Sequence, residues 1–199
     1  MMDGTDYDKI RTNMAARTKP TPAGEAQRAA LREAIAFKKY EFGAHGVEMN
    51  QRYRSTAVMT DGQMEPACEL DAELHYQPTT WPGARLPHVW LFDASGKKHS
   101  TLDLCGHGRF ALFTSIGGEA WVEAANAISA EPGLTLDARL IGPRSDWLDH
   151  TGDWARAREV SDAGCVLVQP DHHVAWRSEA LTDDPAADLR RVRKSILGR

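Results

Sequence analysis

Hydrophobic positions are patterned most clearly in the second half of the chain. Residues 110–114 form a continuous apolar run, which predicts a strand buried on both faces. Residues 134–140 alternate between apolar and polar side chains, which predicts a strand with one face in water. Residues 165–168 and 173–177 are short apolar segments on either side of a polar turn, and together they predict a hairpin.

Helical spacing separates these strands. Trp121, Ala125 and Ile128 share one stripe between a Gly-Gly pair and a Pro-Gly breaker, so a helix is expected there. Further helices are expected around residues 153–162 and, basic and amphipathic, over residues 185–197. The order strand, helix, strand, helix, hairpin, helix is that of a thioredoxin-like α/β domain, whose crossovers predict some parallel pairing.

The first 87 residues are patterned differently. Thr21 and Pro22 are a helix-start pair, and the helix predicted over residues 22–39 has a thin apolar side made mostly of alanine. The other expected segments are a loop at 40–46, extended chain at 47–59, an ordered irregular connector at 77–87, and short strands at 88–92 and 100–104.

Three parts follow from this pattern. Residues 1–21 are polar and predict a flexible arm, because they cannot bury enough apolar surface to offset the entropy of ordering. Residues 22–87 are expected to form a helix plus an extended connector, and residues 88–199 the thioredoxin-like domain.

Composition narrows the classes of protein. The 199 residues carry a net charge of −4, which gives no general attraction to nucleic acid or anionic membranes. There is no apolar run of the roughly 20 residues that a membrane span needs, and the first residues do not resemble a secretory leader. Three distant cysteines indicate reduced thiols rather than a disulfide framework, so a cytoplasmic location is expected.

Four segments carry a resemblance to a known family. They are AHGVEMNQRY at residues 44–53, YQPTTWPGARLPHVWL at 76–91, STLDLCG at 100–106, and GCVLVQPD with HVAWR at 164–171 and 173–177. In this order they resemble the C-terminal part of the FAD-dependent aromatic hydroxylases, of the 2,4-dichlorophenol and phenol monooxygenase type. The resemblance covers roughly residues 22–178 and implies a thioredoxin-like tail that follows the FAD and substrate domains. Residues 22–87 would then correspond to the end of the flavoenzyme's middle region.

The motifs that hold flavin in that family are missing from this chain. The family uses NAD(P)H to reduce FAD, which needs a glycine-rich strand–turn–helix for the pyrophosphate. The sequence contains no G-x-G-x-x-G, and its only Gly-Asp pair, Gly152-Asp153, lies inside the expected tail. We therefore expect this chain alone to bind no cofactor, while FAD and NAD(P)H are implied for the full-length family.

Dithiol redox chemistry and metal binding both need residues that this sequence lacks at the right spacing. Dithiol redox work needs a C-x-x-C where the first central strand meets its helix, and residues 114–119 contain no cysteine. Cys105 and Cys165 are therefore interpreted as small buried hydrophobic side chains. No two of the eight histidines have the i, i+4 spacing of a helical metal site, so no metal is expected.

His45 and Arg52 are the candidate site residues. In full-length relatives this junction lies beside the flavin-bearing part, so either side chain would border the active site; the alternative is a loop histidine and a structural arginine. A second candidate is the cluster Trp81, Arg85, His88 and Trp90, which would bind an aromatic ring or attach the connector to the sheet.

One residue departs from the family pattern. Relatives usually carry glycine where this chain has His172, so a strained turn with positive φ is expected there. The leading hypothesis is a C-terminal, non-flavin-binding portion of a phenol-type hydroxylase, with a structural or assembly role and no catalysis alone. The alternative is a stand-alone thioredoxin-like interaction module that docks on a flavoprotein or self-associates. The phenolic substrate stays open.

Overall fold

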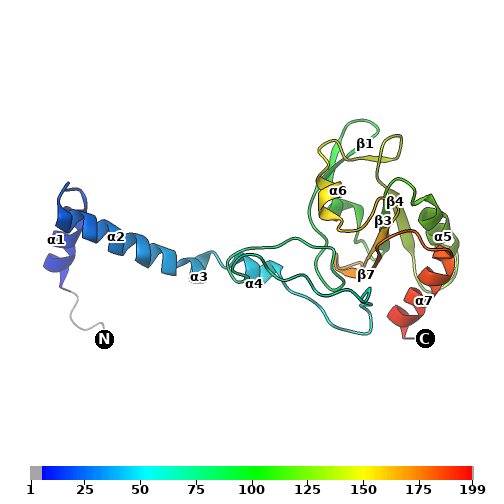
Figure 1. The fold of residues 1–199 in the computed structure, drawn as a ribbon, viewed down its shortest axis with the longest axis horizontal. Coiled ribbons are helices and arrows are strands. Elements are labelled where there is room, and N and C mark those ends of the chain that lie inside the picture. Colours follow the sequence, from blue (N-terminus) through cyan, green and yellow to red (C-terminus); the bar gives the residue numbers. More distant parts are fainter. Residues whose placement is uncertain (1–5, 199) are drawn as a thin grey trace.

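The computed structural model describes residues 6–198. Figure 1 shows a folded body at the C-terminal side and a line of helices that extends away from it toward the N-terminus. The body contains the elements from β1 onward, and residues 50–89 link it to the helices without any strand or helix of their own. Among the described residues, none of the helices is long and apolar enough to cross a membrane.

A four-stranded sheet forms the centre of the body. Its order is β4 (Leu136–Leu140), β3 (Phe110–Thr114), β6 (Cys165–Val168), β7 (Val174–Ser178). Strands β3 and β4 are parallel, whereas β6 is antiparallel to both β3 and β7. With α5 (Glu119–Ser129), α6 (Asp153–Ala157) and α7 (Pro185–Leu197), this is the element order expected of a thioredoxin-like domain. The predicted strand at residues 110–114 and helix at 185–197 are confirmed.

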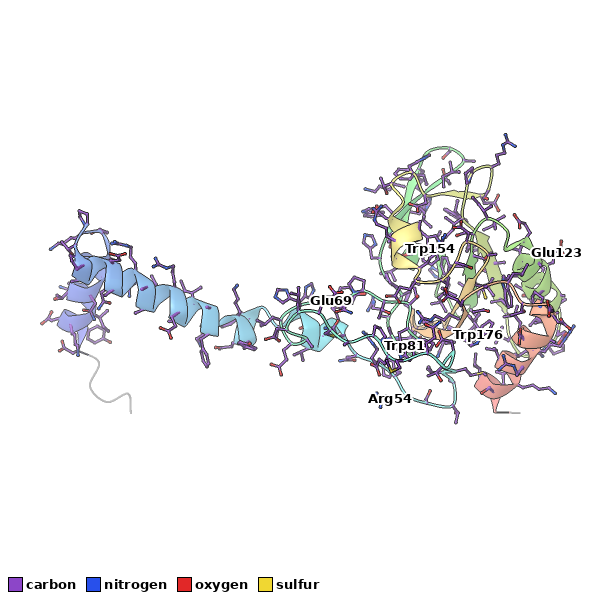
Figure 2. The ribbon with its side chains drawn as sticks, in the orientation of Figure 1. Arg54, Glu69, Trp81, Glu123, Trp154 and Trp176 are labelled. Atoms are coloured by element: carbon purple, nitrogen blue, oxygen red, sulfur yellow. The ribbon has the colours of Figure 1, made fainter. Side chains whose placement is uncertain are left out.

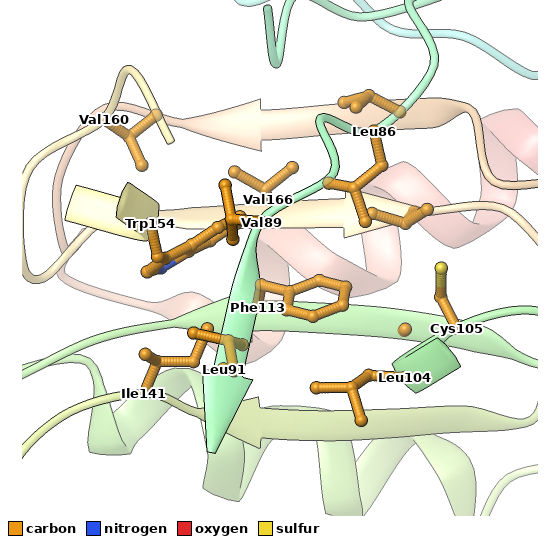
Figure 3. Close-up of a cluster of buried hydrophobic side chains, with 13 residues drawn as sticks. Leu86, Val89, Leu91, Leu104, Cys105, Phe113, Ile141, Trp154, Val160 and Val166 are labelled. Atoms are coloured by element: carbon orange, nitrogen blue, oxygen red, sulfur yellow. The ribbon is translucent and has the colours of Figure 1, made fainter. Parts of the chain in front are cut away.

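Both faces of this sheet are covered. Leu112 points to one face, where it packs with Trp121 of α5 and Val192 of α7. Its neighbour Phe113 points to the other face, where it meets Trp154 of α6 at a ring-centroid distance of 5.4 Å. Successive side chains of a strand alternate between faces, so a strand that is apolar at every position needs such cover on both sides. Figure 3 shows the second cluster, with Phe113 between Trp154 and Cys105.

A smaller antiparallel sheet closes the second face. It consists of β2 (Lys98–Ser100), β1 (Trp90–Asp93) and β5 (Trp147–Leu148) in that order. The strand predicted at residues 100–104 is wrong: Thr101–Leu104 is a 3-10 helix. Ser100 Oγ accepts from the Leu102 amide, and Asp103 accepts from the Ser100 amide, so a capping box turns the chain into a helix there.

The N-terminal helices are α1 (Tyr7–Arg17), α2 (Pro22–Phe37), α3 (Lys39–Phe42) and α4 (His45–Met49). The helix predicted from Pro22 is confirmed, and the side chain of Thr21 caps it by accepting from the Gly24 amide. Within residues 1–21, predicted to be a flexible arm, Tyr7–Arg17 form a helix capped by Asp6. Residues 1–5 of that arm lie outside the described residues.

Two other boundaries differ from expectation. The chain from residue 47 continues as α4 to Met49 before it becomes irregular, because the turn around Gly46 is held against the connector. Helix α6 ends at Ala157 rather than near residue 162, since Arg158 is its C-cap and Glu159 then adopts a φ of +53°.

Candidate functional site

The connector, which from here on means residues 50–89, carries the second motif and pairs with the edge of β7. The amide of Gly83 donates to Val174 O over 2.7 Å, and the amide of Val174 donates back to Ala84 O over 2.8 Å. The amide of Leu86 donates to His172 O. These bonds bring the second and fourth motifs of the sequence side by side, although they lie about ninety residues apart, a distance typical of contacts that only tertiary structure creates.

The first motif joins the same seam through its last residue. The amide of Tyr53 donates to Gly83 O over 2.9 Å. A Cβ on Gly83 would lie 2.2 Å from Tyr53 O, and Gly83 has a φ of +94°. Glycine is therefore required here twice, for its backbone conformation and for the close approach of the two chains.

Arg177 forms the buried centre of this seam. Its side chain is 5% exposed, and its Nε donates to Asp61 Oδ2 over 2.6 Å. Its Nη1 donates to Glu159 Oε2 over 3.1 Å. Because the guanidinium carries several donors in a fixed plane, one buried charge can bind two carboxylates from different segments.

Glu159 extends the network to the connector. Its Oε2 accepts from Thr79 Oγ1 over 2.6 Å and from the Thr80 amide over 3.0 Å. The indole of Trp81 lies 5.2 Å from the guanidinium carbon of Arg177, a cation–π distance. Figure 2 shows Trp81 where the connector meets the body. The network therefore fixes the connector onto the sheet and leaves no buried charge without a partner.

The predicted cluster of Trp81, Arg85, His88 and Trp90 is not a single aromatic site. Trp81 pairs with Arg177, whereas the ring of His88 packs edge-on against Trp90 at 4.6 Å. Lys98 lies over the exposed Trp90 ring, 4.3 Å from its centroid. An arginine that stacks on a tryptophan does attach the connector to the sheet, as expected, but that arginine is Arg177.

Arg177, Asp61 and Glu159 were not predicted as a group. The available signal was a charged residue, Arg177, within an apolar strand segment whose other positions are buried. A buried arginine requires acceptors. Nothing in the spacing of the chain could identify Asp61, 116 positions away, as one of them.

Segment 44–53 is held by its own set of contacts. Asn50 Nδ2 donates to Ala72 O and His75 O, while its Oδ1 accepts from the Gln77 amide over 2.8 Å. A Cβ on Gly46 would lie 2.0 Å from Ala72 O, so the turn of α4 packs directly on the connector backbone. The first motif is therefore joined to the second through Asn50 and Tyr53, while Gly46 packs on the chain just before the second motif.

The two candidate site residues lie in different surroundings. His45 is exposed at the start of α4 and lines a polar cavity of about 410 Å³ beside Phe42 and Glu48. The Arg52 side chain is 11% exposed and lines a separate cavity of about 320 Å³ with Arg54 and Glu65. Arg52 Nε has no hydrogen-bond acceptor within the described part of the chain, and Glu65 Oε1 lies 3.7 Å from it.

The position where a thioredoxin-like fold would hold its reactive dithiol contains no thiol. The turn from β3 to α5 carries Ser115, and the two cysteines of the body are buried elsewhere. Burial raises the pKa of the Cys105 thiol to about 12 and that of Cys165 well above its ordinary value. Thiolates are therefore disfavoured at both, and the prediction that the two side chains are buried is confirmed.

The same turn does not fit a flavin pyrophosphate. A Cβ on Gly118 would lie 1.8 Å from Thr114 Oγ1, so this glycine serves the packing of helix on strand. A dinucleotide cradle needs glycines that leave backbone open to phosphate, and this turn ends at the buried Trp121. Within residues 6–198 no cluster of three or more metal-ligating side chains occurs either.

His172 has the geometry that its place in the family pattern predicts. Its φ is +71°, in the left-handed region, which confirms the expected turn. The amide of His172 donates to Gln169 O, and the imidazole Nε2 lies 3.0 Å from where a Cβ of Gly106 would be. The fourth motif thus contacts the end of the third motif at Gly106.

Known proteins match nearly the whole of this chain. The chain is 50% identical over 194 residues to 2,4-dichlorophenol 6-monooxygenase of Cupriavidus pinatubonensis, covering 96% of this chain and 32% of that protein. It is 45% identical over 187 residues to phenol 2-monooxygenase of Pseudomonas sp., covering 94% and 31%. The chain thus spans about a third of the length of the curated relatives it matches.

A solved structure gives the same result in three dimensions. The flavin-dependent monooxygenase PieE, in complex with FAD and substrate, superposes with a TM-score of 0.79 at 42% identity. The match covers 93% of this chain and 31% of that one. The family model described as aromatic-ring hydroxylase, C-terminal, matches residues 79–199. The chain belongs to the family of aromatic-ring hydroxylase C-terminal domains.

Proposed function

We propose that this chain acts as the C-terminal portion of an FAD-dependent, phenol-type aromatic hydroxylase, together with a flavin-bearing portion that its own described residues do not provide. The observation that carries the proposal is the extent of the match, 96% of this chain against 32% of a 2,4-dichlorophenol 6-monooxygenase. In this role the chain positions and assembles, and FAD and NAD(P)H act on the other portion.

The helical arm supplies the docking surface in this proposal. The arm, residues 7–49, carries large apolar side chains that face solvent, and Figure 1 shows it clear of the body. Phe37 is 76% exposed and Phe42 is 81% exposed. The others are Tyr7, Ile10, Met14, Ile35, Tyr40 and Val47. Apolar surface of this kind marks an interaction site, and the flavin-bearing portion is the occupant that the match to longer hydroxylases favours.

The arm also has a defined link to the connector, which supports docking in a fixed orientation. Tyr40 Oη donates to Asp71 Oδ2 over 2.6 Å, and the amide of Val47 donates to Glu73 O. The hydrogen bond to Asp71 raises the pKa of Tyr40, and the same bond lowers the pKa of the Asp71 carboxyl. These contacts join the C-terminal end of the arm, which carries His45, to the connector.

We place His45 and Arg52 at the border of the flavin site. Arg52 is the stronger of the two, because its guanidinium is mostly buried and its Nε is without an acceptor in residues 6–198. An incompletely satisfied buried cation favours an anionic or oxygen-rich group nearby. Docking of the flavin-bearing portion over the cavity that Arg52 shares with Arg54 and Glu65 would supply such a group.

The experiment adds the purified chain to the 2,4-dichlorophenol monooxygenase of Cupriavidus pinatubonensis truncated before the matched third. We expect the chain alone to lack a flavin absorbance band and to bind the truncated enzyme. Binding should restore hydroxylation. The double substitution Phe37→Ser with Phe42→Ser should weaken binding to the truncated enzyme at least tenfold. Stoichiometric flavin in the purified chain, or no interaction with the truncated enzyme, would contradict the proposal.

The second candidate is an interaction module that self-associates through the same arm. The exposed phenylalanines favour it as much as they favour a flavoprotein partner. Size-exclusion chromatography separates the two: a concentration-dependent dimer that excludes the truncated enzyme supports self-association. A monomer that forms a one-to-one complex with that enzyme supports the hydroxylase role.

A further inference from the structure

A cavity of about 370 Å³ lies at the carboxyl ends of the parallel strands β3 and β4. Ser115 and Ile116 follow β3, while Ile141 and Gly142 follow β4. Helix α6 closes it with Trp154, whose ring is buried. Ligands of α/β proteins bind at this end of parallel strands, and the volume is in the range of small-molecule sites, about 300–1,000 Å³.

The lining is mostly apolar, and its charges are internally matched. Arg158 donates to Val160 O and pairs with Asp162. Asp149 accepts from the amides of Asp153 and Ala155, where it caps α6. One guanidinium, two carboxylates and the imidazole of His150 line the cavity, and because the carboxylates outnumber the guanidinium the lining does not favour an anion. The cavity therefore fits a neutral ligand.

Ser115 is the polar group that would orient such a ligand. Ser115 is 4% exposed, and its Oγ accepts a hydrogen bond from Trp154 Nε1 over 3.2 Å. Its hydroxyl hydrogen has no acceptor among the residues described. A buried hydroxyl with an unused donor favours a ligand oxygen. The indole of Trp154 beside it favours a ring over an alkyl chain, because aromatic pairs gain beyond their buried area.

Gly142 keeps the cavity open. A Cβ at this position would lie 3.0 Å from Ile116 Cγ1, so any larger residue would crowd the cavity wall where the segments after β3 and β4 meet. The φ of Gly142 is not positive, so its backbone conformation does not require glycine. Ile116 is 56% exposed at the rim, which leaves apolar surface for a ligand to cover.

We propose that this cavity is a second, non-catalytic binding site for a small neutral phenol, held by the Ser115 hydroxyl and the Trp154 ring. The choice of a phenol rests on the proposed function, since the substrate class of a phenol-type hydroxylase is the ring that would reach this site. The cavity is formed by residues of the body alone and includes neither His45 nor Arg52.

The test uses the full chain and follows the indole N–H resonance of Trp154 by NMR during titration with phenol. We expect a saturable shift of that resonance and of the Gly142 amide. Cyclohexanol, neutral but without a ring, should bind at least threefold more weakly, and benzoate should give no saturable shift. A saturable benzoate shift as strong as that of phenol would overturn the neutral class of ligand.

Variants place the binding in this cavity. Gly142→Val and, on the exposed side of α6, Ala155→Phe should each weaken phenol binding at least tenfold, while Ser115→Ala should weaken it about fivefold, the equivalent of one hydrogen bond. Leu70→Trp changes a different cavity and should leave binding unchanged. Two filling variants are used so that a folding defect in one, seen by circular dichroism, does not decide the result.

The results separate this inference from the proposed function. Absence of a saturable Trp154 shift, or a shift unchanged in both Gly142→Val and Ala155→Phe, would overturn the site. Phenol binding in a chain that fails to restore hydroxylation would overturn the hydroxylase role and leave the site in place. Restored hydroxylation without the Trp154 shift would overturn the site and leave the hydroxylase role in place.

Discussion

Arg177 Nε donates to Asp61 Oδ2 over 2.6 Å, which joins a strand of the body to a turn of the connector 116 positions earlier. Both side chains are buried, at 5% and 8% exposure. Because Glu159 binds the same guanidinium, three segments of the chain depend on one positive charge. The second and fourth motifs are thus joined by a buried network of charges as well as by backbone hydrogen bonds.

Replacement of Arg177 by methionine should destabilise the chain by about 3–5 kcal/mol, because the buried Asp61 carboxylate would lose its partner and Glu159, whose side chain is 35% exposed, would lose its link to the strand. Urea unfolding measures the change. The control is Arg191→Met, whose ion pair with Asp188 is largely exposed and should cost less than about 1 kcal/mol. Equal losses of unfolding free energy in the two variants would show that the Arg177 network adds no more stability than an exposed ion pair.

Two glycines with similar backbone angles test the close approach in the seam. Gly83 and Gly96 have φ of +94° and +82°, but only Gly83 has a neighbour, Tyr53 O, at the Cβ position. Gly96→Ala should cost about 1 kcal/mol of backbone strain, and Gly83→Ala at least about 2 kcal/mol more. Thermal unfolding of both variants gives the comparison, and similar midpoints would show that the seam yields to a methyl group.

The left-handed conformation of His172 predicts a stabilising substitution. A non-glycine residue in this region costs roughly 1–2 kcal/mol, and glycine recovers part of it against its greater freedom in the unfolded chain. His172→Gly should therefore raise stability by about 0.5–1 kcal/mol. His173→Gly should lower it, since the ring of His173 packs on Tyr53 at 4.5 Å. Loss of stability in His172→Gly would mean that its ring contributes more than the backbone strain costs.

Thiol reactivity should divide the three cysteines. Cys105 and Cys165 are buried, whereas Cys68 is half-buried on the connector. Ellman's reagent at pH 8 should therefore label one thiol quickly in the native chain and all three in urea. Cys68→Ser should abolish the fast phase. A second fast thiol in the native protein would show that the sheet opens more readily than its packing indicates.

Stability should fall at alkaline pH because of Cys105. Its pKa is raised to about 12 in the folded chain from an ordinary value of 9.0. Between these values the unfolded chain loses the proton and the folded chain keeps it, so stability present below pH 9 is lost as pH rises toward 12. Cys105→Ala should be less stable than the parent at pH 8, and the difference should narrow by on the order of 2 kcal/mol by pH 11. A constant difference would refute this assignment.

The regular elements of the body were predictable because each is specified locally. Strand β3 is apolar throughout, and α7 begins with Pro185 after the capping Asp184. The 3-10 helix at Thr101–Leu104 was mistaken for a strand, because its apolar alternation is shared by both structures while the Ser100–Asp103 capping box decides between them. Helix α1 was missed since its stripe is weak and none of its side chains is buried.

The candidate site was predicted less completely than the fold. His45 and Arg52 were identified from their place in the first motif, and their role at a flavin border stays a prediction. The Arg177 network was not identified, because its partners come from three segments whose proximity arises only from packing. The cavity beside Trp154 was also not foreseen, since it is formed by the ends of elements that do not adjoin in sequence.

The most direct test of the central claim is the yield of hydroxylated phenol per NAD(P)H consumed by a fusion. In this fusion the chain replaces the matched C-terminal third of the Cupriavidus pinatubonensis 2,4-dichlorophenol monooxygenase. We predict that the fusion, but not the truncated enzyme, hydroxylates 2,4-dichlorophenol, and that most of the NAD(P)H it consumes is matched by an equal amount of hydroxylated product. A fusion that folds and binds FAD but yields no more product than the truncated enzyme would contradict the claim that this chain is a working hydroxylase C-terminal portion.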